Sequence, residues 1–193
     1  MFARLTLAAA VATLAVGAAV AQAPQQRLAG TVKSLAAGHL VITGATGDVD
    51  LVLAPTTRIV LLKAASSSEI KPGAYLGTAN VTTEEGGRAT EVHLADNGPN
   101  VHSVMNAGTG LMMTNGHVKS VATTGKGQEM DVDYGTGARH VVVPPNTPVT
   151  RMNPADVTAL KPGTSVTAAA QTATDGKLVA VFVAIQPPKP AKP

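Results

Sequence analysis

Imidazole and thioether side chains gather in one part of this chain. They are His93, His102, Met105, Met112, Met113 and His117, all within 25 residues. Ring nitrogens and thioether sulfurs, without thiols, are ligands that suit copper in an oxidising compartment. Methionine also fills gaps in apolar cores, and the six residues follow no compact ligand spacing. The set therefore predicts periplasmic copper handling only as an alternative function.

Acidic side chains form a second candidate set. Asp48-Val-Asp50 and Asp131-Val-Asp133 are the same tripeptide, and Glu129 extends the second one. In a strand, residues two apart share one face and lie about 7 Å apart. A calcium ion takes six or more oxygen ligands, which is more than either stripe offers. We interpret these carboxylates as a solvated strand face.

The sequence lacks the familiar catalytic patterns. It has no cysteine, and it contains no Gly-x-Ser-x-Gly, no glycine-rich phosphate loop and no His-Glu-x-x-His. His102 and Ser103 are neighbours, but successive side chains of an extended chain point to opposite faces. We therefore expect a protein that is not an enzyme, with no catalytic residue and no cofactor apart from the candidate copper.

The charge distribution argues against nucleic-acid binding. The formal net charge is +3, but Arg4 lies in a candidate leader, and Lys189 and Lys192 lie in a proline-rich tail. Between Pro24 and Gln186 there are 12 basic and 12 acidic residues. A nucleic-acid interface needs Lys and Arg clustered on one face to displace counterions. The body of the chain offers no such cluster.

Residues 1–23 have the three parts of a secretory signal peptide. Arg4 gives a positive start, residues 5–16 are rich in Ala, Leu and Val, and small residues then provide cleavage sites. We expect cleavage after Ala21 or Ala23. The mature protein is then periplasmic or secreted, without stable membrane insertion, and without disulfides because it has no cysteine.

The chain contains an internal repeat. Gly30-Thr-Val-Lys-Ser-Leu-Ala36 corresponds to Gly116-His-Val-Lys-Ser-Val-Ala122, and Lys71-Pro-Gly73 corresponds to Lys161-Pro-Gly163. The predicted organisation is a first repeat at 24–95, a linker at 96–114, a second repeat at 115–186 and a disordered Pro/Lys tail at 187–193.

Each repeat has the pattern of a small β-domain. Apolar and polar residues alternate as in half-buried strands. Asn153, Pro154 and Asp156 predict the start of a short helix that Pro162 ends, and Ser66–Ser68 give a weaker start in the first repeat. Three strands, a short helix and two strands is the order of an OB-like barrel. We predict an all-β protein of two tandem OB-like small β-barrels, each with one short helix between its third and fourth strands.

The last strands of the two repeats differ in one informative way. Glu91 and His93 in the first repeat correspond to Ala180 and Phe182 in the second. The second strand is therefore apolar on both faces, and such a strand needs cover on both. We expect Ala180 and Phe182 to form an interface between the repeats, or alternatively in a dimer.

Taken in order, these motifs resemble a family of exported proteobacterial proteins. The shared features are two copies of Gly-x-Val-Lys-Ser, a Pro-Thr or Pro-Asn-Thr strand end, Lys-Pro-Gly and a Val-rich last strand. The family carries a domain of unknown function of the small β-barrel type, and some members are labelled metal ABC transporter permease. The resemblance implies a fold but no established activity.

Three functions remain open from the sequence. The first is a non-catalytic exported binding or accessory module of unknown ligand, with its site on a barrel face or between the repeats. The second is copper handling through the His/Met set. The third is a purely structural domain that contacts an envelope protein or polymer, and the protein is expected to be a monomer or a dimer.

Overall fold

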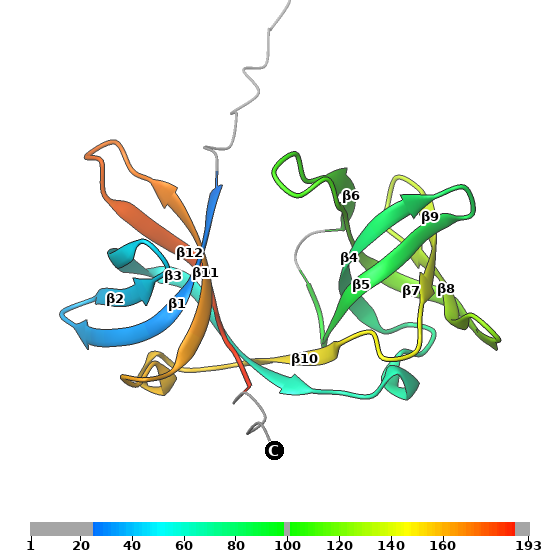
Figure 1. Ribbon diagram of the computed structural model, residues 1–193, viewed down its shortest axis with the longest axis horizontal. Helices are drawn as coiled ribbons and strands as arrows, with labels where there is room; N and C mark the ends of the chain where they lie inside the picture. Colours follow the sequence, from blue (N-terminus) through cyan, green and yellow to red (C-terminus); the bar gives the residue numbers. More distant parts are fainter. Residues whose placement is uncertain (1–24, 99–100, 188–193) are drawn as a thin grey trace, which may run out of the picture.

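The computed structural model describes residues 25–98 and 101–187, and the predicted signal peptide lies outside this part. The described chain is all-β (Figure 1). Its strands are β1 (Gln25–Ala36), β2 (His39–Gly44), β3 (Gly47–Ala64), β4 (Tyr75–Thr83), β5 (Gly86–Ala95), β6 (His102–Met105), β7 (Met112–Thr124), β8 (Gly127–Asp133), β9 (Ala138–Val143), β10 (Val149–Pro154), β11 (Ser165–Thr172) and β12 (Leu178–Ile185).

Five strands close one barrel, here called ring A. Strands β12, β11, β1, β2 and β3 are antiparallel neighbours in that order. A parallel pairing between β12 and β3 closes the ring. Closure leaves few unpaired strand edges, which protects a sheet from edge-to-edge association.

The same pattern of pairing recurs in a second group of strands, here called ring B. Strands β9, β8, β7, β4 and β5 follow one another as antiparallel neighbours. A short parallel pairing between β5 and β9 closes this ring. The two rings lie side by side in Figure 1, and the crossing strands β3 and β10 join them at the bottom of the view.

The strand pairing groups the chain differently from the predicted repeats at 24–95 and 115–186. Ring B is built from one continuous stretch, residues 75–143, whereas ring A combines residues 25–64 with residues 165–185. The reason lies in β3, which has 18 residues and so extends for about 60 Å. It therefore leaves ring A and delivers the next strand to ring B, so each ring takes strands from both repeats.

The two rings nevertheless pair their strands in equivalent register. Ala29 lies opposite Thr167 in ring A, and Asn115 lies opposite Gly77 in ring B. Gly30 of the first repeat packs against the carbonyl oxygen of Thr43, and Gly116 packs in the same way against the next strand. A Cβ atom at either glycine would collide with backbone, which explains why the repeated motif begins with glycine.

The predicted short helices are only single 3₁₀ turns. The first, at Ser67–Glu69, has Ser66 as its N-cap, and the Glu69 carboxylate accepts a hydrogen bond from the Ser66 N–H, forming a capping box. The second, at Val157–Ala159, is capped by Asp156. Asn153 does not cap it, because β10 continues through Pro154. None of the helical turns in the described part of the chain is long and apolar enough to span a bilayer.

Each ring encloses its own aliphatic core, and a third cluster lies between them. Ring A buries Leu40, Leu51 and Val183, while ring B buries Leu76, Val92 and Met130. Side chains of the crossing strands and of β12 form the third cluster, which contains Val60, Leu62, Met152, Phe182 and Ala184. This cluster fills part of the space between the two rings.

Candidate functional site

The structure distributes the six residues of the predicted metal set over three strands. His93 lies on β5, His102 and Met105 lie on β6, and Met112, Met113 and His117 lie on β7. Met105 is opposite Met112, whereas Met113 is opposite Val104. Since successive residues of a strand point to opposite faces, Met112 and Met113 cannot share a ligand site.

The histidines of that set have separate partners. His102 Nε2 lies 3.0 Å from the Asn115 side-chain nitrogen, and His117 packs edge-on against the ring of Tyr75 at 5.3 Å. Within residues 25–98 and 101–187 no three His, Asp or Glu side chains are placed to hold a metal ion. The structure therefore does not bring the six residues together as one site.

The carboxylate stripes pair with side chains on neighbouring strands. Asp48 pairs with Lys33, and Asp50 lies 3.0 Å from Nδ1 of His39. The Asp131 carboxylate accepts a hydrogen bond from Ser120 at 2.7 Å. This bond and a further contact with His140 lower the pKa of Asp131. These exposed groups form the cross-strand pairs of a solvated sheet face.

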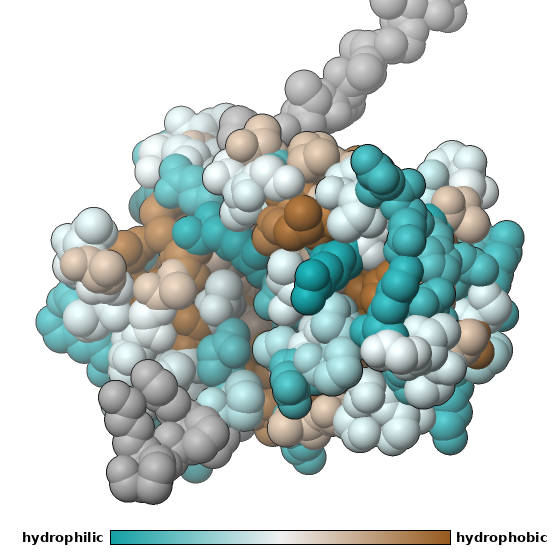
Figure 2. Space-filling model, turned by 45° about the vertical axis from the view of Figure 1, so that its right-hand side comes forward, coloured by the Kyte–Doolittle hydropathy of each residue, from teal (hydrophilic) through white to brown (hydrophobic). Residues whose placement is uncertain are grey.

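His93 lines a different candidate site, which is a groove between the two rings. Its volume is about 300 Å³, close to the lower end of small-molecule sites. Ring B contributes Glu91 and His93, ring A contributes Phe182, and the crossing strands contribute Leu62 and Met152. The remaining lining residues are Arg27, Thr167, Ala168, Ala169, Ala184 and Gln186. In Figure 2 hydrophobic surface flanks a hollow near the centre of the face shown.

The polar wall of the groove is an ordered group of side chains. His93 Nδ1 lies 2.6 Å from the Thr150 hydroxyl, and His93 Nε2 lies 3.6 Å from the Glu91 carboxylate. Both nitrogens of the imidazole ring therefore have a polar neighbour, which fixes the orientation of the ring. Only 24% of the His93 side chain and 34% of the Glu91 side chain are exposed.

The electrostatics of the groove keep Glu91 ionised. The contact with His93 lowers the pKa of Glu91, and this effect outweighs the burial that raises it; Arg27 lowers it further. Arg27 belongs to β1 of ring A, and Glu91 belongs to β5 of ring B. A carboxylate therefore stands on one wall with a guanidinium near it on the other.

The predicted interface residues have different environments. Ala180 is buried in the core of ring A, and its carbonyl oxygen accepts a hydrogen bond from the Thr57 hydroxyl. Phe182 is partly buried on the opposite face of β12, where it packs with the third cluster and lines the groove. The two residues thus lie on opposite faces of β12, Ala180 in the core of ring A and Phe182 beside the groove.

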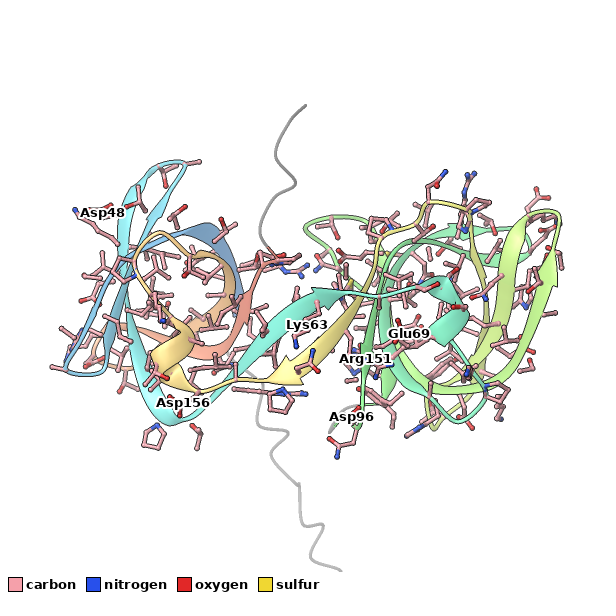
Figure 3. The ribbon with its side chains drawn as sticks, turned by 90° about the horizontal axis from the view of Figure 1, so that it is seen from below. Asp48, Lys63, Glu69, Asp96, Arg151 and Asp156 are labelled. Atoms are coloured by element: carbon pink, nitrogen blue, oxygen red, sulfur yellow. The ribbon has the colours of Figure 1, made fainter. Side chains whose placement is uncertain are left out.

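A second polar cluster lies beneath the crossing strands. Arg151 on β10 donates to the Glu69 carboxylate from Nε at 3.3 Å and from Nη2 at 2.9 Å. Its Nη1 is 3.5 Å from Asp96, and Lys63 lies opposite it on β3 (Figure 3). These contacts connect β10 with the first 3₁₀ turn and with the residue that follows β5.

Three other hollows in the described part of the chain are larger but less suited to specific recognition. The smallest of them, of about 420 Å³, lies beside Asp48 and Asp50. One of about 580 Å³ lies beside the β4–β5 turn, where exposed Glu85 pairs with Lys126. Another, of about 600 Å³, lies beside the turn after β1 and includes Pro55 and Asp156. Charged groups at these sites are exposed, so bulk water competes with any ligand.

The sequence predicted a ligand site on a barrel face or between the repeats without assigning residues to it, although a signal for the groove was present. Glu91 and His93 occupy the positions that Ala180 and Phe182 occupy in the other repeat. The structure brings these equivalent strands, β5 and β12, to opposite walls of one groove. Arg27 and Thr150 had no comparable signal, because their place in the groove depends on how the rings are arranged.

Comparisons with known proteins give no further assignment. The chain matches no family model, no curated protein and no solved structure. The residues of the groove must therefore carry the functional argument.

Proposed function

We propose that this protein is a non-catalytic exported binding module whose ligand occupies the groove between the rings. The observation that carries the proposal is the contrast between the groove walls. The partly buried Glu91–His93 pair stands on one side, and Phe182 and Met152 supply apolar surface on the other. A small number of oriented polar groups in an otherwise apolar hollow is typical of a small-molecule site.

The chemistry of the walls defines the ligand. Its apolar part lies against Phe182 and Met152, and a cationic or hydrogen-bond-donating group contacts the ionised Glu91. The contacts of His93 with Thr150 and Glu91 hold the polar wall in place before a ligand binds. Binding therefore costs little conformational entropy of these side chains.

The fold proposed for this module is a pair of OB-like barrels. Around ring A the strands follow in the order β1, β2, β3, β12 and β11. If β11 and β12 are counted as the fourth and fifth strands, this order is first, second, third, fifth and fourth. Ring B has the same order when β4 and β5 take those places. The parallel pair between third and fifth strands and the turn of helix after the third support this assignment. The predicted signal peptide supports export to the periplasm.

A binding experiment tests the proposed site. The mature protein is dialysed against a small-molecule extract of the cell envelope, and retained compounds are identified by mass spectrometry. Ala169→Trp fills the groove from β11, and Val81→Trp is the matched control because Val81 is exposed and does not line the groove. We expect compounds retained by the wild type and Val81→Trp but lost from Ala169→Trp. Retention that Ala169→Trp leaves unchanged, or the absence of any retained compound, contradicts the proposal.

A further inference from the structure

Strand β6 has one free edge. It pairs with β7 along four residues and lies outside the closed path of either ring. On its other edge, no backbone hydrogen bond to another strand is found in the part of the chain that the structure describes. Unpaired N–H and C=O groups on a strand edge are a template for another strand.

This edge lacks the charged side chains that usually prevent association. Three of the five exposed large hydrophobic residues in the described chain belong to it or adjoin it: Val101 (43% exposed), Val104 (52%) and Met105 (52%). Residues 97–118 contain no Asp, Glu, Lys or Arg. Proteins normally protect an exposed edge with charged residues, so the edge of β6 is suited to docking.

The edge is also held in a fixed position. Ser103 on β6 hydrogen-bonds to Thr114 at 2.9 Å, and Asn80 donates to Thr114 at 3.3 Å. Arg139 of β9 donates from Nε to the side-chain Oδ1 of Asn80 at 2.9 Å. Thr114 and Asn80 are both fully buried. This chain of bonds ties β6 to the interior of ring B, so the edge is preorganised for a partner.

We propose that the free edge of β6 binds an extended, uncharged, apolar segment of a partner protein as an additional strand. Backbone hydrogen bonds supply the attraction, and the side chains of Val104 and Met105, on opposite faces, select apolar residues. A four-residue strand is only about 13 Å long. That is too little for a stable dimer, which buries about 800 Å² on each partner, so a peptide segment fits better than a second copy of this chain.

A displayed library of random heptapeptides tests this surface. Binding of selected peptides is compared between the wild type, Val104→Lys and the matched control Val157→Lys, because Val157 is also exposed, at 39%, but lies in the second 3₁₀ turn. We expect uncharged peptides rich in β-branched residues, with binding weakened at least tenfold by Val104→Lys and unchanged by Val157→Lys. Equal urea midpoints show that both variants are folded.

Two further readouts separate the possible outcomes. Hydrogen exchange should slow at β6 amides when a selected peptide is bound, and sedimentation of the free protein should show a monomer. No enriched peptide, or binding that Val104→Lys does not weaken, overturns the proposal. Self-association that Val104→Lys abolishes would assign the edge to a second copy and would also overturn it. Ala169→Trp should leave peptide binding intact, so this result is independent of the groove.

Discussion

Asn80 offers the most demanding test of how ring B holds β6 in place. Its side chain is fully buried, accepts a hydrogen bond from Arg139 Nε at 2.9 Å and donates one to Thr114 at 3.3 Å. Asn80→Ala removes one charge-assisted bond, of about 1.5–3 kcal/mol, and one neutral bond, of about 0.5–1.5 kcal/mol. We expect a loss of about 2–4 kcal/mol in the free energy of unfolding. For a chain of this size that lowers Tm by about 5–15 °C.

A double-mutant cycle separates this interaction from general damage to the core. Unfolding in urea is followed by tyrosine fluorescence for Asn80→Ala, Arg139→Met and the double variant. The expected coupling energy between the two positions is about 1.5–3 kcal/mol. Thr82→Ala removes another Arg139 contact, 3.0 Å long and exposed, and should cost less than about 1 kcal/mol. A coupling energy below about 0.5 kcal/mol for Asn80 and Arg139 would refute the reasoning.

Three more predictions concern the groove, the glycine contacts and the formation of ring B from one continuous stretch of chain. The pKa of Glu91 is lower in the folded protein than the ordinary 4.5, so its stabilisation is present above that pH and disappears as pH falls through the folded pKa. Glu91→Gln should therefore flatten the acid side of the stability profile measured in urea, as should His93→Gln. Gly116→Ala places a Cβ against the Asp133 carbonyl and should cost about 1–3 kcal/mol in thermal unfolding. Residues 65–150 contain every strand of ring B and should fold alone, with dispersed amide signals in an NMR spectrum.

Each of these outcomes has a clear contrary result. An unchanged acid profile in Glu91→Gln would show that His93 does not stabilise the ionised carboxylate. A Gly116→Ala variant as stable as the wild type would show that the adjacent backbone can move away. A fragment of residues 65–150 without dispersed signals would show that ring B depends on ring A.

Local sequence signals predicted the strands better than their partners. Alternating residues indicated β-structure, and the all-β prediction is confirmed. Pro72 and Pro162 follow the single turns capped by Ser66 and Asp156, but too few residues separate cap from proline for a longer helix. Local propensities therefore located these elements but overestimated their length.

The choice of strand partners could not be predicted from local signals. Both repeats contain the same motifs, so the sequence does not indicate which ring takes β4 and β5. The continuation of β3 to Ala64 decides between them, because it extends past Leu61, the last β3 residue that pairs with β12, and carries the chain away from ring A. The groove follows from that path. Its residues therefore came together only in three dimensions, although the contrast between His93 and Phe182 had pointed to the right strands.

Engineered cysteine pairs test most directly that each ring takes strands from both repeats and so forms the groove between them. The chain has no cysteine of its own. Ala29 and Thr167 are directly opposite in ring A, within the distance that a disulfide spans. In ring B Met113 pairs with Ala79 of the first repeat, and Ala169 is the equivalent of Ala79 in the second repeat. Met113 and Ala169 would therefore be opposite each other only if the second repeat closed its own barrel. We predict that Ala29→Cys/Thr167→Cys forms a disulfide under mild oxidation and Met113→Cys/Ala169→Cys does not. A disulfide in the second pair and not in the first would contradict the account.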